Sequence, residues 1–266
     1  MELPLLIVLI TITGIAAILG LLAYGLFKIR AFQRHMYSCL NERIPRLISN
    51  ELHTQLLTHF HQTEALAGLL MELGFARSLP ATRGWAASPD FLRELARHAL
   101  QAQPKVIAEC GSGVSTLVLA RCAQMNETGH VYSLEHLAEH ADKTREELAR
   151  HGLTAWATVL TAPLRPYELH GQTYAWYSIE QLPAVVVDML VIDGPPINTG
   201  QLARYPAGPL LFRYLSPSAT VFLDDADRPD ERAILQRWGD EFHEFAHDAR
   251  MCEKGCAILR KQATKS

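Results

Sequence analysis

The N-terminal end of the chain is almost entirely apolar. From Leu3 to Phe27 no side chain carries a charge, and about 20 apolar residues suffice to cross the hydrocarbon core of a bilayer. A cleaved signal peptide would have a basic start and a shorter apolar stretch, whereas here Glu2 precedes a longer run without a clear cleavage site. Residues 1–30 are therefore predicted to form an uncleaved transmembrane anchor.

The charges beside this anchor predict its orientation. Lys28, Arg30 and Arg34 follow the apolar run at once, while Glu2 is the only side chain with a charge before it. The positive-inside rule then places the C-terminal side in the cytoplasm. The cysteines agree with a reducing compartment, because they form an odd, scattered set unlike a disulfide framework: Cys39, Cys110, Cys122, Cys252 and Cys256. We expect a single-pass membrane protein whose folded domain lies in the cytoplasm.

Residues 31–84 are predicted to be a helical connector. Leucine and isoleucine recur there at mixed three- and four-residue spacings, which indicates one or two amphipathic helices. Pro45 should start or kink a helix, which argues against a long uninterrupted coiled coil. Three histidines lie in this segment without the cysteines or carboxylates of a recognised zinc pattern, so we expect ordinary solvated or packed side chains: His53, His59 and His61.

From residue 85 onward the pattern changes to short apolar runs that alternate with helical segments. This alternation is typical of an α/β domain with a mostly parallel sheet. The expected strands cover 105–110, 130–135, 155–162, 188–193 and 221–225, with closing strands at 241–247 and 255–261. Helices are expected after Ser88, after Gly113 and over 229–238. Residues 85–266 are therefore predicted to be one folded domain.

Composition narrows the function of this domain. Hydrophobic residues make up 48% of the chain, enough for a full core without disulfides or metals. The formal net charge of -3 gives no overall basic field, which argues against nucleic acid as a partner.

A glycine turn follows the first expected strand. Gly111, Ser112 and Gly113 separate the run KVIAEC from a helical segment, and such a turn lets the backbone approach a ligand beside the free N–H groups of the helix. A short GxG turn alone is a weak signal. It is strengthened by Glu135, which ends the next strand at the distance where an acid binds ribose hydroxyls in dinucleotide folds.

These residues resemble the motifs of class I S-adenosylmethionine-dependent methyltransferases, in which an acid precedes GxG and the second strand ends in an acid. The resemblance implies a Rossmann-like, doubly wound, seven-stranded sheet whose last strand is antiparallel. It also implies that S-adenosylmethionine is the cofactor, with its methionine part near Glu109 and the turn 111–113, its ribose on Glu135 and its adenine beside Ala162. An NAD-dependent oxidoreductase is disfavoured, because Thr116 replaces the third glycine of the dinucleotide pattern.

Three aspartates end the later strands of the domain. Asp193 follows the run MLVI, and Asp224 with Asp225 follows VFL, so parallel strands would bring all three to one edge of the sheet. Carboxylates that meet in a cleft must pair with cations, share protons or bind a metal. Oxygen ligands favour a hard ion such as Mg²⁺.

The three acids are similar to the metal site of the catechol O-methyltransferase-like branch, and this resemblance implies that Asp193, Asp224 and Asp225 hold a divalent metal. Asp225 departs from that branch, which carries an amide there, and no basic residue follows Asp193. The alternative remains open that Asp193 acts at the cofactor edge or as a general base, and that Asp224 or Asp225 pairs with an arginine, Arg228 or Arg232. Asp193 and Asp225 are the predicted catalytic residues.

The sequence thus predicts an O-methyltransferase that acts on a small-molecule or lipid-linked acceptor, with Mg²⁺ as an optional cofactor. The alternative is a catalytically silent S-adenosylmethionine-binding or scaffold protein at the membrane. Residues 165–182 hold four aromatic side chains that either cover the acceptor or pack into the core, and packing is favoured: Tyr167, Tyr174, Trp176 and Tyr177.

Overall fold

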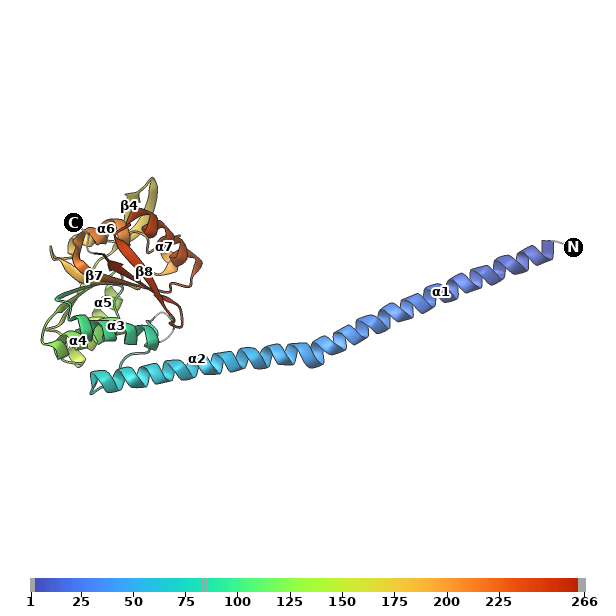
Figure 1. Cartoon of the computed structure of the whole chain (residues 1–266), viewed down its shortest axis with the longest axis horizontal. Helices are drawn as coiled ribbons and strands as arrows, with labels where there is room; N and C mark the ends of the chain where they lie inside the picture. Colours follow the sequence, from blue (N-terminus) through green and yellow to red (C-terminus); the bar gives the residue numbers. More distant parts are fainter. Residues whose placement is uncertain (1–2, 83, 85, 263–266) are drawn as a thin grey trace. The chain divides into compact units, whose positions relative to one another are not determined.

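The computed structural model describes residues 3–82, 84 and 86–262 (Figure 1). Contacts within the chain divide it between His59 and Phe60 into two compact units. The division falls inside a helix, so the second unit includes the last turns of that helix as well as everything that follows. Trp85, where the sequence predicts the domain to begin, lies outside the described residues.

The first unit is helical throughout its described part. Helix α1 covers Leu3–Ser38, a π-helical turn covers Cys39–Arg43, and α2 covers Ile44–Leu73. The π turn directly precedes Pro45, whose ring nitrogen cannot donate the usual hydrogen bond to the preceding turn. A π-helical turn is a common way to accommodate such an interruption without ending the helix. Pro45 therefore changes the local winding, and the helix continues.

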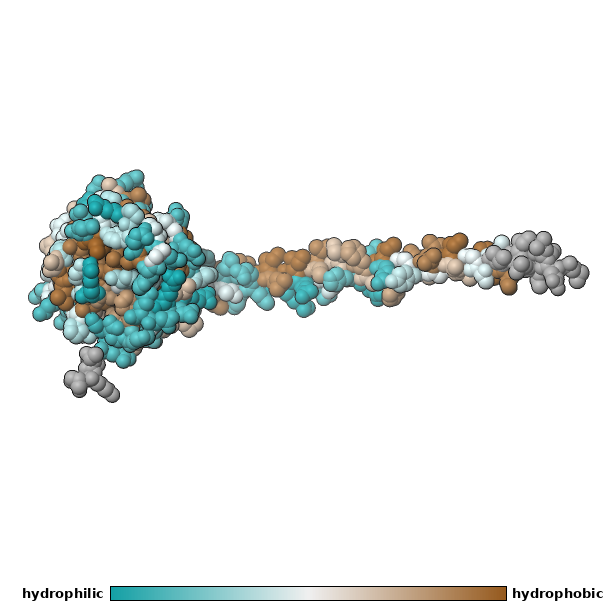
Figure 2. Space-filling view, turned by 90° about the horizontal axis from the view of Figure 1, so that it is seen from above, coloured by the Kyte–Doolittle hydropathy of each residue, from teal (hydrophilic) through white to brown (hydrophobic). Residues whose placement is uncertain are grey.

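No side chain described between residues 8 and 59 is buried. Apolar side chains are exposed along the whole segment, and Figure 2 shows them in brown, interrupted by hydrophilic residues in teal. By length and composition the helix could cross a membrane. Beyond the expected anchor the exposed row continues at four-residue intervals: Leu40, Ile44, Ile48, Leu52, Leu56 and Phe60.

The second unit is built on a seven-stranded sheet in the order β3-β2-β1-β6-β7-β9-β8. The strands are β1 (Val106–Cys110), β2 (His130–Glu135), β3 (Ala157–Thr161), β6 (Val187–Ile192), β7 (Leu215–Asp224), β8 (Phe245–Arg250) and β9 (Cys256–Lys261). Neighbours are parallel from β3 to β7, whereas β9 is antiparallel to both β7 and β8. The predicted Rossmann-like sheet with an antiparallel last strand is confirmed.

Helices cover both faces of this sheet, which makes it doubly wound. On one face α3 (Pro89–Ala102), α4 (Val114–Asn126) and α5 (Ala138–Arg150) bury apolar side chains against Ile107, Val131 and Phe222. On the other face α6 (Ala207–Leu211) and α7 (Pro229–Glu241) pack against the alternate residues, such as Leu134 and Leu223. This alternation follows from the two-residue period of a strand. The carboxyl ends of β1, β2, β6 and β7 are left for a ligand.

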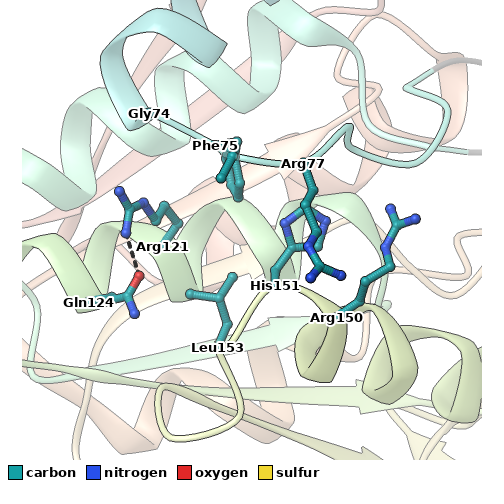
Figure 3. Close-up of a pocket in the computed structure, with 9 residues that line it drawn as sticks. Gly74, Phe75, Arg77, Arg121, Gln124, Arg150, His151 and Leu153 are labelled. Carbon is teal, nitrogen blue, oxygen red and sulfur yellow. Dashed lines mark hydrogen bonds between the residues drawn. The ribbon is translucent and has the colours of Figure 1, made fainter.

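A small cavity lies where α2 ends and the chain turns toward α3 (Figure 3). Arg121 of α4 donates from Nε to the Leu73 carbonyl at 2.8 Å, which caps the last turn of α2. Arg150 of α5 donates to the Ser78 carbonyl at 2.8 Å. The two arginines therefore fasten the segment after α2 to the helical layer of the sheet.

Residues 164–177 form a β-hairpin. Strand β4 (Leu164–Leu169) pairs antiparallel with β5 (Gln172–Tyr177). Tyr174, Trp176 and Tyr177 are all buried and join the core beneath α6 and α7. In the crossover from β6 to β7, only α6 and two single turns, Ile197–Thr199 and Phe212–Tyr214, are helical. Prolines and glycines at positions 195–209 limit helix length there.

Candidate active site

The glycine turn joins β1 to α4 and touches the end of β6. Gly111 has a φ of +100°, and a Cβ at this position would lie 3.2 Å from the Asp193 carbonyl oxygen. Its N–H donates to the Leu134 carbonyl at 2.9 Å. Only glycine combines this backbone conformation with so close an approach of two strand ends.

Glu109 lies beneath this turn. Its side chain is fully buried, and its Oε2 accepts a hydrogen bond of 2.5 Å from the Thr116 hydroxyl. That hydroxyl in turn accepts the Gly113 N–H at 3.0 Å. Burial raises the pKa of Glu109 to about 7. Glu109 therefore supports the glycine turn from inside the domain.

Glu135 at the end of β2 is held in its charged form. Its Oε2 accepts hydrogen bonds of 3.1 Å from both the N–H and the hydroxyl of Ser112, and its Oε1 accepts the Leu137 N–H at 3.0 Å. Burial acts to raise the pKa of Glu135, but the hydrogen bonds from His136, Leu137 and Ser112 outweigh it and hold that pKa below its ordinary value. A fixed carboxylate is thus presented beside the glycine turn.

One cavity of about 660 Å³ connects these residues with the ends of β6 and β7, a size typical of sites for small organic ligands. The turn residues 111–113 and Glu135 line one part of it, and Asp193, Asp225 and Arg204 line another. The remaining wall comes from loops and from residues that follow the strands: Gly84, Ala86, Ala87, Val114, Ser115, His136, Leu137, His140, Tyr177, Gly194, Pro196, Asn198, Thr199, Arg228 and Lys254.

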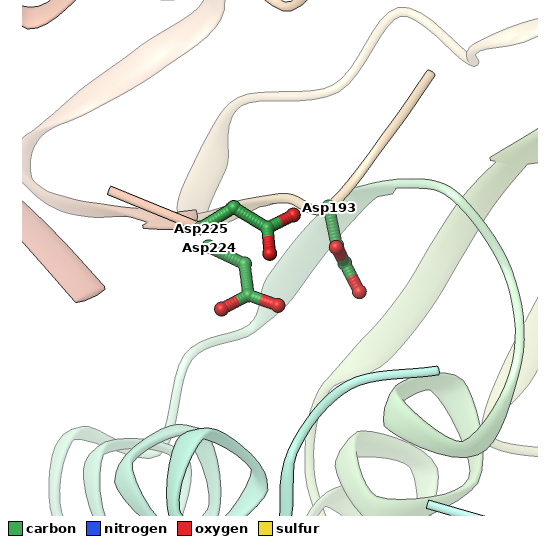
Figure 4. A group of neighbouring side chains, drawn as sticks. All are labelled: Asp193, Asp224 and Asp225. Carbon is green, nitrogen blue, oxygen red and sulfur yellow. The ribbon is translucent and has the colours of Figure 1, made fainter. Parts of the chain in front are cut away.

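The three predicted aspartates lie together at this edge of the sheet (Figure 4). One carboxylate oxygen from each of Asp193, Asp224 and Asp225 falls within 4.8 Å of the others, and among the described residues they are the only such group with the ligand types of a metal. Asp224 is fully buried and contributes nothing to the cavity wall, whereas Asp193 is partly accessible from the cavity. Asp225 has a φ of +59°, a conformation that Asp tolerates better than most residues.

A guanidinium group sits between these acids. Arg204 donates from Nη2 to Asp193 Oδ1 at 3.2 Å and to Asp225 Oδ2 at 2.8 Å, and from Nη1 to the Asp224 carbonyl at 2.9 Å. Asp225 has further cationic neighbours, Arg228 Nη1 at 2.8 Å and Lys254 Nζ at 3.9 Å. The predicted alternative of an ion pair between Asp225 and Arg228 is therefore present, with Arg204 as an additional partner.

Burial changes the acidity of the cluster. It raises the pKa of Asp193 to about 6 despite the opposing effect of Arg204, and it raises the pKa of Asp224 well above its ordinary value. Asp193 is then largely ionised at neutral pH and can still accept a proton. The arrangement fits Mg²⁺ poorly, because one oxygen of Asp193 and one of Asp225 already receive N–H groups of Arg204, and the remaining oxygens of the cluster lie beside that fixed positive charge.

The structure brings most of the predicted site residues to the cavity but not all. Gly111, Ser112, Gly113, Glu135, Asp193 and Asp225 line it. Glu109, Ala162 and Asp224 do not, because all three are fully buried, and Ala162 donates its N–H to the Glu135 carbonyl at 2.7 Å. Sequence reasoning missed Arg204 and Lys254, which reach the site from distant segments, whereas Tyr177 was among the aromatic residues considered for the acceptor. His136 could have been found, since it directly follows Glu135.

Comparisons with known proteins agree with this geometry. Residues 108–226 match a family model described as a methyltransferase domain. Among similar solved structures, cofactor-bound Rv0187 from MTB has a TM-score of 0.53 at 22% identity, over 76% of this chain and 91% of the other. The O-methyltransferase TomG from Streptomyces achromogenes, in complex with S-adenosylmethionine, has 0.52 at 15%, over 76% and 89%.

A third similar structure is the methyltransferase PaMTH1 from Podospora anserina, bound to S-adenosylhomocysteine. Its TM-score is 0.54 at 13% identity, over 84% of this chain and 97% of the other. At these identities the structures establish the fold, and the matched segment runs from β1 to the loop after β7. It therefore contains the glycine turn, Glu135 and all three aspartates.

Proposed function

We propose that this chain, which carries a methyltransferase domain of the class I S-adenosylmethionine-dependent fold, transfers a methyl group from that cofactor to a hydroxyl oxygen. One observation carries the proposal: a single cavity joins the glycine turn and Glu135 to the partly accessible carboxylate of Asp193. Such a cavity has room for a donor and an acceptor side by side, which is the arrangement that group transfer needs.

The cofactor would bind along the turn. Glu135 has a fixed, ionised carboxylate with which to accept hydrogen bonds from the ribose hydroxyls. The backbone at Gly111 and Gly113 allows the methionine part to approach closely, and Leu137 offers an apolar surface to the adenine. S-adenosylmethionine supplies an electrophilic methyl group on a sulfonium. The protein need only position the acceptor oxygen and remove its proton.

Asp193 is the proposed general base. Its carboxylate reaches the cavity, and a pKa raised by burial to about 6 leaves it ionised at neutral pH yet more basic than an exposed aspartate. Asp193 would accept the proton of the acceptor hydroxyl as the methyl group passes from the sulfonium sulfur to the oxygen, and the cofactor would leave as S-adenosylhomocysteine. Asp225 supports the same edge through Arg204 and has no separate proton-transfer role in this proposal.

The N-terminal helix suggests where the acceptor is found. We infer that residues 1–30 anchor the chain in a membrane with the catalytic domain on the cytoplasmic side, as the basic residues Lys28, Arg30 and Arg34 favour. Anchoring raises the effective concentration of the enzyme toward lipid-linked or membrane-associated acceptors. Carbonate extraction tests the anchor: the full chain should stay in the membrane pellet, and release of the full chain would contradict the proposal.

Calorimetric titration of the full chain in detergent micelles with S-adenosylmethionine tests the central claim. Binding is expected for the wild type and is expected to be lost in Glu135→Ala. Glu139→Ala is the matched control, because Glu139 is an exposed acid of α5 that forms an ion pair with Lys143 and does not line the cavity. Absence of binding by the folded wild type would refute the proposal. Binding without formation of S-adenosylhomocysteine from membrane extracts would instead favour a silent cofactor-binding or scaffold protein.

A further inference from the structure

The cluster of acids at the ends of β6 and β7 has a cation of its own. Arg204 is 3% exposed, and its Nη2 lies within hydrogen-bond distance of a carboxylate oxygen from each of Asp193 and Asp225. Its Nη1 binds the Asp224 carbonyl, so one planar group bridges the ends of both strands. A guanidinium is suited to this task because its donors form a rigid fork that fits several oxygen acceptors at once.

The charges around Arg204 nearly balance without an added ion. Four carboxyl groups, Asp193, Asp224, Asp225 and Glu231, surround it, and Arg204, Arg228 and Lys254 provide three positive charges. Asp224 has no hydrogen-bond partner at either side-chain oxygen among the described residues and is fully buried, a setting in which the neutral acid is favoured. The three cations therefore offset most of the negative charge of the cluster without an added metal.

A divalent metal would have to enter beside this guanidinium. The metal would compete with Arg204 for Asp193 Oδ1 and Asp225 Oδ2. It would also add two positive charges next to a guanidinium group that stays protonated. Asp225 Oδ1 and both side-chain oxygens of Asp224 have no hydrogen-bond partner among the described residues, but a metal bound to them would still lie next to the positive charge of Arg204.

We propose that Arg204 takes the place of a divalent cation in this site and fixes the carboxylate of Asp193 toward the cavity, so that the site works without a metal. Arg204 is thus a positioning residue, which acts through Asp193. The inference deepens the proposed methyl transfer and rests on it for the role of Asp193. The occupancy of the acid cluster by Arg204 is a separate physical claim, and it can be tested without turnover.

The test is uptake of Mn²⁺ by the full chain in detergent micelles, followed by the loss of the electron paramagnetic resonance signal of free Mn²⁺. The wild type is expected to leave this signal unchanged. Arg204→Gln, which removes the charge and keeps one donor group, is expected to take up Mn²⁺ in stoichiometric amount, and adding Asp193→Asn should abolish that uptake. Arg232→Gln is the control, because Arg232 contacts the Asp227 carbonyl and none of the three aspartates.

Wild-type uptake of Mn²⁺ that Asp193→Asn removes would overturn the inference. A folded Arg204→Gln variant that takes up no Mn²⁺ would overturn it as well, and thermal unfolding establishes whether that variant is folded. If Arg204→Gln does not fold, Mn²⁺ uptake by the wild type alone decides whether a divalent metal or Arg204 occupies the acid cluster. Titration of the same samples with S-adenosylmethionine separates the inference from the proposed function. Absence of cofactor binding by the wild type contradicts the proposed function, whereas the Mn²⁺ result still tests whether Arg204 occupies the acid cluster.

Discussion

Replacing Glu109 by glutamine should change how the stability of the domain depends on pH. Glu109 is fully buried, and burial raises its pKa from 4.5 to about 7. Because the pKa of the folded state lies above that of the unfolded state, the folded state holds an extra proton between these values. The stability that this proton contributes is fully present below about pH 4.5 and is lost as the pH rises through 7. At about 1.4 kcal/mol per pH unit, the loss amounts to about 3 kcal/mol.

Glutamine is neutral at every pH and keeps an oxygen that can accept the Thr116 hydroxyl, so Glu109→Gln should escape this loss. For a domain of this size about 3 kcal/mol corresponds to roughly 6–12 °C in the melting temperature. Thermal unfolding followed by circular dichroism at pH 5 and pH 8 measures it, with exposed Glu139→Gln as the control. The melting temperature of Glu109→Gln should exceed that of the wild type only at pH 8. Parallel pH profiles of the two proteins would refute the reasoning.

Two further predictions concern the edges of the cavity. Gly111→Ala should destabilise the domain by about 1–3 kcal/mol, since the residue has a φ of +100° and the new Cβ would lie 3.2 Å from the Asp193 carbonyl oxygen. Gly113→Ala should cost less, because no atom lies within 4 Å of its Cβ position, and equal melting temperatures would contradict this account. With Asp193 as general base, kcat/KM should fall about tenfold per pH unit below about pH 6, where its carboxylate becomes protonated. A pH–rate profile that is flat through this range would argue against Asp193 as the base.

Local pattern predicted most of the scaffold and the cofactor side of the site. Strand β2 falls at 130–135 as expected, and the glycine turn and Glu135 meet because β1 and β2 are neighbours in the sheet. The meeting of Asp193 with Asp224 and Asp225 was also predictable, since parallel strands bring their carboxyl ends to one edge. Each of these expectations needed only the period of a strand and the order of the elements.

The cations of the site could not be placed in this way. Arg204 lies in a crossover without a long helix, and Lys254 lies in the turn before β9, so no periodicity fixes where either side chain points. Lys254 also donates to the Ala86 carbonyl at 3.2 Å, a contact between residues 168 positions apart in the sequence. Ala162 was wrongly predicted to border the ligand for a different reason. It follows β3 as expected, but its small side chain is buried in the core. Which cation meets an acid depends on packing between loops, and sequence pattern carries little information about that.

The contact between Gly111 and Asp193 has a consequence for inhibition. The two loops that meet there line the same cavity. A molecule that joins an adenosine part to an acceptor-like hydroxyl would therefore find no segment of the protein between the sites for its two parts. Linking the two halves makes the second binding event intramolecular, and such a bisubstrate ligand should bind far more tightly than either half alone.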